Sequence, residues 1–399
     1  MPIGTAVHER TFALCESLNY RDWSGYYAVS AYEGHHEHEY NAIRNAAALI
    51  DVSPLFKYLV TGADAARFVD RLITRDVTNL APGQVYYTPW CDEHGQVIDD
   101  GTVSRLAERT FRWTSADPSL RWFRQNAAGF DVAIEDISEE YAALSLQGPT
   151  AARLLRTVSD ADIDRLKYFR VTSGSIGGVR VDVSRTGYTG DLGYEIWIPV
   201  RHAVAVWDTL MEFGRPFDIK PAGMLALDVA RVEAGLLLID VDFFSSKKAM
   251  IDAQRYSPYE MGLGRLVSLD KARFIGQQAL REEHRRGHEK QVVGLEIDWP
   301  EVEAIYEKLG LAPSVGATAS RVAVPVYRNG RQVGKATSTT WSPVLKRMIA
   351  LATVDRPHYV TGTMLDIELT VEAVRYRVGA TVVPTPFFNP PRKTASPVV

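Results

Sequence analysis

Apolar and polar positions alternate along the chain with two periods, one typical of helices and one typical of strands. In residues 39–50, EYNAIRNAAALI, apolar residues recur at helical spacing, which puts Ile43, Ala46, Ala47 and Ile50 on one face. Helices are also predicted over residues 63–73, 149–158, 203–213 and 221–235. Strands are predicted over residues 55–60, 85–90, 96–98, 111–114, 142–146, 179–183 and 194–200. Because strands and helices do not alternate strictly, the pattern indicates an α+β fold rather than a doubly wound sheet.

The pattern changes near residue 290. Residues 282–290, EEHRRGHEK, are charged and suit a linker or an exposed helix end. Mostly strand-like segments follow, over residues 292–297, 322–327, 333–339, 348–354, 365–371 and 374–383. Asn329-Gly330 lies between two of them and is typical of a tight hairpin turn. We therefore expect a first region at residues 1–290 and a small all-β domain, a barrel, at residues 291–399.

Composition narrows the function classes. The 399 residues carry 45 Lys and Arg against 49 Asp and Glu, a net charge of −4, so no dedicated nucleic-acid-binding face is expected. No apolar run approaches the roughly 18 residues that span a bilayer, and the first residues lack the apolar core of a signal peptide. Two cysteines are too few for a disulfide framework. The expectation is a soluble, cytoplasmic protein with no membrane partner.

The sharpest local signal is residues 184–196, SRTGYTGDLGYEI, where three glycines fall within seven residues between two strands. Such glycines permit tight turns and the close approach of a ligand. The segment is not a phosphate loop, because it lacks the Gly-Lys-Ser/Thr ending and a following helix. In the strand that follows, Glu195 and Trp197 point away from Tyr194 and Ile196. A carboxylate in so apolar a strand needs a partner, so Glu195 either binds a ligand or pairs with an arginine at a strand edge.

Two further segments carry charged side chains in suggestive positions. Asp99 and Asp100 end a short strand, and only one of them can face a given pocket. A carboxylate there can accept a proton or stabilise a cation, although from these residues alone an Asp-Asp-Gly turn is the favoured explanation. Asp228 and Arg231 are three residues apart on a predicted helix, which usually means an ion pair on the helix surface.

Histidines gather in residues 34–39, GHHEHE. The spacing is not the His-Glu-x-x-His arrangement of a helical zinc site, and no second cluster supplies further ligands. We therefore expect no metal, and a solvated loop before the helix.

Taken in order, these motifs resemble the aminomethyltransferase family, the T-protein of the glycine cleavage system and its relatives. The matching segments are IDVS at 50–53, RDVTNL at 75–80, PGQ at 82–84, YTP at 87–89, the Asp-Asp segment at 95–100, LQGP at 146–149, the glycine segment at 184–196, ARVEAG at 230–235, GKATS at 334–338, SP at 342–343 and VVPTPF at 382–387. The resemblance covers about residues 38 to 393. It implies a folate-binding fold of two interleaved α+β subdomains followed by a C-terminal β-barrel.

The resemblance also implies transfer of a one-carbon unit onto tetrahydrofolate. Asp100 matches the family's catalytic aspartate, and Tyr188 and Glu195 match its pterin-binding tyrosine and glutamate. A carboxylate such as Glu195 can accept two hydrogen bonds from the planar donor edge of a pterin. Arg231, in the matching segment 230–235, and Leu55, just after the matching segment 50–53, are assigned to the same cofactor site. Arg392, with the lysine after it, is a candidate for the folate glutamate tail, with a plain tail charge as the alternative.

The chain departs from the T-protein pattern mainly on the donor side. Pro54-Leu55 replaces His-Met, Leu227 replaces an arginine, and residues 115–117 and 239–242 also differ, as do the segments 243–259 and 299–316. The last of these resembles folate-dependent O-demethylases. We therefore expect a demethylase-type transfer from a small methylated donor to tetrahydrofolate. The alternatives are the glycine-cleavage aminomethyltransferase, which takes an aminomethyl group from a lipoyl carrier protein, and a folate-binding module without catalysis.

Overall fold

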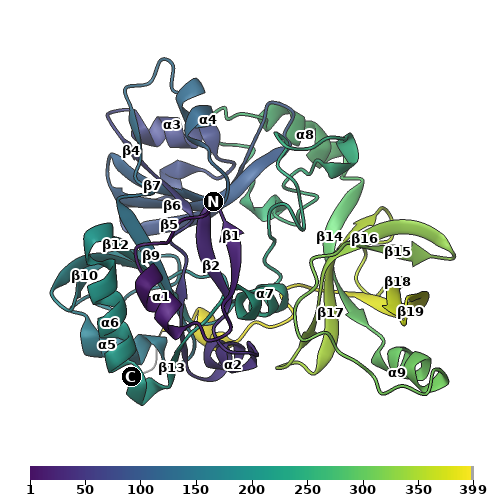
Figure 1. Ribbon diagram of the computed structural model, residues 1–399. Helices are drawn as coiled ribbons and strands as arrows, with labels where there is room; N and C mark the ends of the chain where they lie inside the picture. Colours follow the sequence, from purple (N-terminus) through teal and green to yellow (C-terminus); the bar gives the residue numbers. More distant parts are fainter. Residues whose placement is uncertain (397–399) are drawn as a thin grey trace.

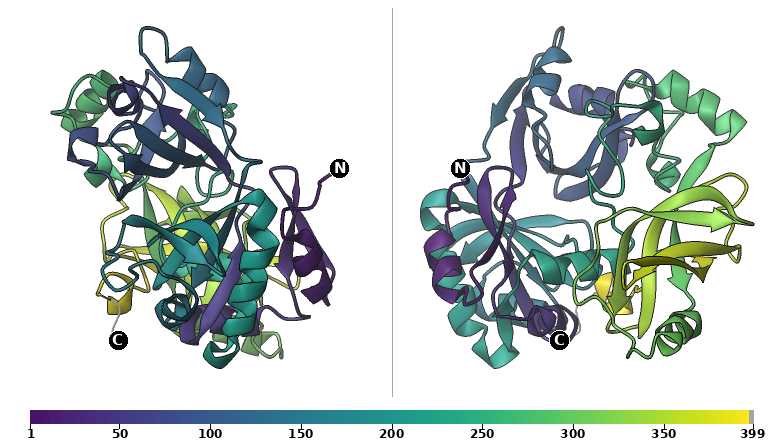
Figure 2. Two further views of the ribbon diagram at one scale, coloured as in Figure 1. Left: turned by 90° about the vertical axis from the view of Figure 1, so that its left-hand side faces the viewer. Right: turned by 45° about the vertical axis from the view of Figure 1, so that its right-hand side comes forward.

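The computed structural model describes residues 1–396 and contains two β-sheets, a β-hairpin and a closed barrel (Figure 1). The chain begins with α1 (His8–Leu14) and the hairpin of β1 (Asn19–Trp23) and β2 (Tyr26–Ala31). Short 3₁₀ helices cover Val77–Asn79, Val200–His202, Arg215–Phe217, Asp252–Gln254, Gly264–Leu266 and Pro391–Lys393. The two sheets and the barrel form three units around the middle of the molecule (Figure 2), where α7 (Met224–Glu233) lies (Figure 1). This mixture of elements confirms the predicted α+β fold.

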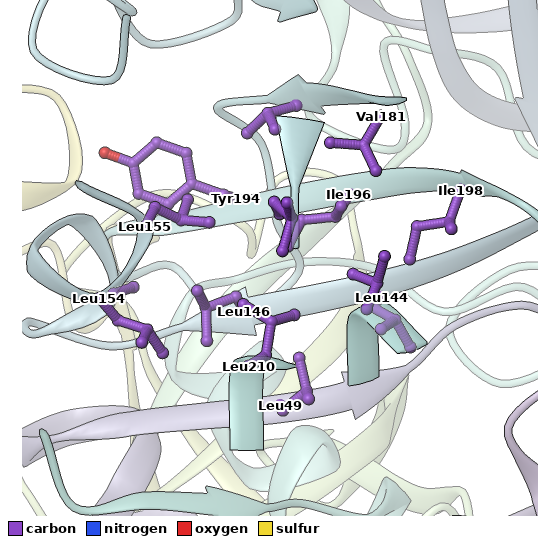
Figure 3. Close-up of a cluster of buried hydrophobic side chains, with 14 of the residues drawn as sticks. Leu49, Leu144, Leu146, Leu154, Leu155, Val181, Tyr194, Ile196, Ile198 and Leu210 are labelled. Atoms are coloured by element: carbon purple, nitrogen blue, oxygen red, sulfur yellow. The ribbon is translucent and has the colours of Figure 1, made fainter. Parts of the chain in front are cut away.

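The first sheet has six strands in the order β10-β11-β12-β9-β3-β13. Their bounds are Val171–Ile176, Val179–Ser184, Gly193–Pro199, Tyr141–Gln147, Ala47–Asp51 and Ile219–Pro221. Helices α5 (Ala151–Val158) and α6 (Ala203–Phe213) contribute to the core on one face. Figure 3 shows that core, which includes Leu144, Leu146, Tyr194, Ile196 and Ile198. Because strand side chains alternate, Glu195 and Trp197 face the other way, as predicted.

The prediction of one helix over residues 39–50 is wrong. Helix α2 spans Glu37–Asn45, and Ala47–Asp51 form strand β3 between β9 and β13. Ala47 and Leu49 lie in the core under α5 and α6, whereas Ala48 and Ile50 lie in a second apolar cluster with α2 and α7. A strand buried on both faces is a continuous apolar run, which periodicity alone does not separate from a helix.

The second sheet is inserted between β3 and β9 of the first, so the two are interleaved in the chain. It has five strands in the order β5-β6-β7-β4-β8. Their bounds are Gln84–Cys91, Val97–Ala107, Thr110–Ser115, Phe56–Thr61 and Ala133–Asp136, and α3 (Ala65–Leu72) and α4 (Leu120–Gln125) contribute to the core of this unit. The long antiparallel pair of β5 and β6 carries Asp100.

The barrel closes in the order β14-β17-β16-β15-β18-β19. From β14 to β19 the strands span Lys290–Ile297, Val324–Arg328, Arg331–Ser342, Arg347–Asp355, Met364–Val371 and Val374–Val383. Helix α8 (Gln277–Arg286) precedes it, and α9 (Trp299–Lys308) lies between β14 and β15. Asn329 and Gly330 have φ of 51° and 79°, which confirms the predicted hairpin with a turn of positive φ.

Helix α7 (Met224–Glu233) connects these units. It contacts α2 and β2 on one side and β16 and β17 of the barrel on the other (Figure 1). Nine of its ten residues are buried, including Asp228, Arg231 and Glu233. Charged side chains on this helix must therefore find partners inside the protein. Among residues 1–396, no helix has the length and apolar character needed to cross a membrane.

Candidate functional site

Strand β6 separates the two adjacent carboxylates. The Asp99 side chain is fully buried and accepts the backbone N–H groups of Asp100 at 2.8 Å and Asp117 at 3.0 Å. The Asp100 side chain is half-buried and accepts the phenol of Tyr87 at 2.6 Å, from the neighbouring strand β5. Asp99 is thus occupied in holding the backbone, whereas Asp100 is the carboxylate with a partly open side.

Burial raises the pKa of Asp100 to about 6, and the hydrogen bond from Tyr87 acts in the opposite direction. Such a group changes its charge just below neutral pH, in the range useful for assisting proton transfer or stabilising a cation.

This pKa gives a test by pH. We expect activity to rise with pH as Asp100 ionises, with a midpoint near 6. Because the Tyr87 phenol favours the ionised carboxylate, Tyr87→Phe should move the midpoint of the kcat profile to higher pH. Tyr86→Phe, the neighbouring residue in β5, is the matched control and should leave the midpoint in place. An unchanged midpoint in Tyr87→Phe would show that Asp100 does not set the profile.

Tyr188 lies in the loop between β11 and β12, and its phenol donates to the backbone carbonyl of Leu237. Burial raises the pKa of this phenol, and the charges of Arg231 and Asp100 both act on it. Tyr188 also packs against the apolar cluster that Leu55 joins. The structure thus brings Asp100, Tyr188, Arg231 and Leu55 into one region.

Glu195 lies on β12, and its Oε2 accepts the Thr186 hydroxyl. Thr186 is itself hydrogen-bonded to Ser184 at 2.8 Å, and the Trp197 indole donates to Ser184 at 3.1 Å. Among residues 1–396, Glu195 has no ion pair, and no side chain or amide donates to its Oε1. The structure therefore does not support the alternative of a strand-edge glutamate paired with an arginine.

Arg112, on β7 of the second sheet, is the cation whose charge acts on the pKa of Glu195. It stacks over the Trp197 ring at 4.5 Å and donates to Asp182 at 2.7 Å. Burial raises the pKa of Glu195, and both the Thr186 hydrogen bond and the Arg112 charge oppose that rise. The carboxylate is thus held in place while one oxygen stays available for a planar donor.

The predicted ion pair between Asp228 and Arg231 is present, but its predicted place on the helix surface is wrong, because α7 is enclosed. Arg231 is fully buried and donates to Asp242 at 2.5 Å and to Ser338 at 2.8 Å. Its Nε lies 3.8 Å from Asp228, whose main partner is Arg321 at 2.6 Å. Arg231 therefore connects α7 to the loop after it and to the barrel strand β16.

Arg392 is already engaged in this structure. Its guanidinium forms a two-point contact with Asp191 at 2.6 and 2.8 Å and donates to the Arg44 carbonyl at 3.1 Å. A folate tail at this position has to compete with the buried Asp191 carboxylate.

The histidine segment forms the predicted solvated loop only in part, since His35 and His38 are exposed but His36 and Glu39 are not. His36 is buried at the start of α2, and Glu39 is buried and accepts the amides of Tyr32 and Gly223 at 2.7 Å. The helix starts earlier than predicted, which turns part of the segment inward. Within residues 1–396 no three potential metal ligands gather.

A surface hollow of about 480 Å³ lies elsewhere, lined by residues that include Asp76, Tyr259, Lys271 and His284. None of the predicted site residues borders it. Lys271 donates to three backbone carbonyls at the hollow's edge, which gives it a structural role.

Three groups at the site were not among the predicted site residues: Tyr87, Arg112 and Arg321. Tyr87 lies within a matching motif, but its contact with Asp100 depends on the pairing of β5 with β6. Arg112 and Arg321 reach the site from the second sheet and from the loop before β15, and no spacing in the sequence connects them to it.

Two family models match the chain. The model described as GCVT N-terminal domain matches residues 6–271, and the Glycine cleavage T-protein C-terminal barrel domain matches residues 308–389. An aminomethyltransferase of Caldanaerobacter subterraneus subsp. tengcongensis is 34% identical over 82% of this chain and 82% of its own. A trimethylamine-oxide aldolase of Ruegeria pomeroyi is 34% identical over 97% of this chain and 47% of its own.

A solved structure shares the fold. The aminomethyltransferase T of the glycine cleavage system from Bartonella henselae has a TM-score of 0.81 and 23% identity, over 98% of this chain and 99% of its own. Fold and family together define the chain as a tetrahydrofolate-dependent one-carbon transferase. It belongs to the glycine cleavage T-protein family, which confirms the predicted family, enzyme class and cofactor.

Proposed function

We propose that this protein transfers a one-carbon unit from a nitrogen-bearing donor, of the aminomethyl class, to tetrahydrofolate. The observation that carries the proposal is Asp100, a half-buried carboxylate with a raised pKa that the Tyr87 phenol holds in place. The charges of Asp100 and Arg231 both act on a second phenol, that of Tyr188. Relatives named aminomethyltransferase support the aminomethyl class.

The residues present fit a reduced pterin. Oε2 of Glu195 is fixed by Thr186, which leaves Oε1 to accept from the ring N–H and amino group. Tyr188 and Leu55 supply an apolar wall beside it. Bound in this way, tetrahydrofolate supplies the nucleophilic nitrogen that receives the one-carbon unit.

Asp100 has two tasks in this proposal. Ionised, it stabilises the positive charge that develops as a nitrogen is alkylated. It then accepts the proton which that nitrogen loses, a step suited to a pKa near 6. Tyr87 holds the carboxylate in position for both.

The nature of the donor is the finer part of the proposal. The names of the relatives favour aminomethyl transfer, and thus a lipoyl carrier protein as partner, over the demethylase-type transfer expected from the sequence. A small methylated amine is the second candidate donor. It is favoured by the alignment with the trimethylamine-oxide aldolase, which spans 97% of this chain against 82% for the first aminomethyltransferase.

The experiment supplies tetrahydrofolate with either donor. An aminomethylated lipoyl protein should yield ammonia, the free thiol and methylene-tetrahydrofolate. Methylated amines should yield the demethylated amine and methyl-tetrahydrofolate, because transfer of a methyl group in exchange for a proton changes no oxidation state. No folate product from either donor would contradict the proposed function.

Glu195→Ala should weaken tetrahydrofolate binding by about 1–3 kcal/mol, because the donor edge of the pterin is left without its acceptor. Calorimetry measures the dissociation constant. Glu135→Gln, an exposed glutamate on β8, is the control and should bind normally. An unchanged dissociation constant in Glu195→Ala would reject this role.

A further inference from the structure

Two arginines converge on one buried carboxylate at the middle of α7. Arg321 donates to both oxygens of Asp228, at 2.6 and 2.8 Å, and Arg21 donates to one of them at 3.3 Å. Arg21 comes from the N-terminal hairpin and Arg321 from the loop that leads into the barrel. Their side chains keep 24% and 38% of their surface exposed, whereas Asp228 keeps 6%.

The charges in this cluster do not balance. Arg231 pairs mainly with Asp242, at 2.5 Å, and its Nε lies 3.8 Å from Asp228. The arginines Arg21, Arg231 and Arg321 thus face two carboxylates, Asp228 and Asp242, which leaves an excess of one positive charge. Burial lowers the pKa of Arg21, and the nearby Arg321 lowers it further. Two like charges held this close are costly unless a second anion joins them.

The cluster lies beside the proposed reaction site. Asp228 is one helical turn before Arg231, and both charges act on the Tyr188 phenol together with Asp100. Ala319, two residues before Arg321, packs in the apolar cluster that Leu55 and Tyr188 join. The Ser320 and Thr339 backbones are hydrogen-bonded in both directions, at 2.7 and 3.0 Å, which fixes this loop to β16.

Helix α7 also differs from the family pattern next to Asp228. Leu227 stands where the T-protein pattern has an arginine next to the aspartate. Here the Asp228 carboxylate receives its guanidinium groups from Arg21 and Arg321 instead. These side chains reach it from outside the helix and keep an exposed face.

We propose that Arg21 and Arg321 bind the carboxylate of a small amine donor. A guanidinium group binds a planar carboxylate through two parallel hydrogen bonds. Arg21 and Arg321, with an excess of one positive charge between them and their acids, therefore form a site for the carboxylate of an amino acid that is methylated on nitrogen. The inference rests on the proposed function and narrows its donor to an anionic molecule.

The test compares acids with their amides. Glycine betaine, N,N-dimethylglycine and N-methylglycine are titrated into the full chain by calorimetry, each beside the corresponding uncharged amide. At least one acid should bind ten-fold or more tightly than its amide. Arg321→Gln should remove that difference, Arg321→Lys should restore part of it, and tetrahydrofolate affinity should stay unchanged.

Controls separate this site from general charge. Arg347→Gln removes an exposed arginine of the barrel that pairs with Glu296 and should keep the acid preference. Arg21→Gln gives a second test should Arg321→Gln fold poorly. Equal affinity for acids and amides, or turnover of an aminomethylated lipoyl protein with no acid bound, would overturn the inference and leave the proposed function standing. Binding of an acid without any folate product from any donor would instead contradict the proposed function.

Discussion

Asp100→Asn should lower kcat by about 10²- to 10⁴-fold, the range that general acid–base assistance usually supplies. The substitution keeps the shape of the side chain and still lets Tyr87 donate to it. It removes the negative charge that stabilises the alkylated nitrogen and the base that takes its proton. Binding of tetrahydrofolate should change by less than about three-fold, because Glu195 and not Asp100 is assigned to the pterin edge.

Single-turnover measurements with saturating tetrahydrofolate separate the chemical step from binding. Asp366→Asn, on barrel strand β18, is the control for an Asp-to-Asn change in a strand and should keep full activity. If kcat of Asp100→Asn stayed within three-fold of the wild type, Asp100 would not be catalytic. Folate binding with no turnover even in the wild type would favour the non-catalytic module.

Strand alternation could be predicted wherever one face of a strand is buried and the other faces a site. The sequence placed Glu195 and Trp197 opposite Tyr194 and Ile196, and the structure agrees. The Asn329-Gly330 hairpin was predictable for a similar reason, since both residues adopt the positive φ that such a turn needs. The prediction for residues 47–51 was wrong because both faces of β3 are buried, which leaves no alternation of apolar and polar residues to detect.

The site was predictable only in its motif residues. Asp100, Tyr188 and Glu195 stand in motifs of the family, but the groups that tune them come from other elements. Arg112 reaches Trp197 across two sheets, and Arg321 reaches Asp228 over 93 residues of chain. The first contact follows from the packing of the two sheets and the second from the packing of α7 between the hairpin and the barrel, and no local pattern encodes either.

The largest effect of a substitution on stability is expected at Glu233, because α7 is enclosed and this charged residue is buried on it. The Glu233 side chain is fully buried and accepts the Tyr40 phenol at 2.6 Å, Arg44 at 2.6 Å and the Ser342 hydroxyl at 2.5 Å. These partners lie on α2 and at the end of β16, so one carboxylate joins the N-terminal region to the barrel.

Glu233→Ala should lower the free energy of unfolding by about 3–5 kcal/mol, because Arg44 is left as a buried charge without its main partner. Glu233→Gln should cost less, since the amide oxygen still accepts from Tyr40 or Ser342. Denaturant unfolding followed by fluorescence measures the change. Glu296→Gln, which breaks the exposed pair with Arg347, should cost at most about 1 kcal/mol. If Glu233→Ala lowered the free energy of unfolding by less than about 1 kcal/mol, the barrel would be held to α7 by apolar packing alone, and the hydrogen bonds of Glu233 would contribute little.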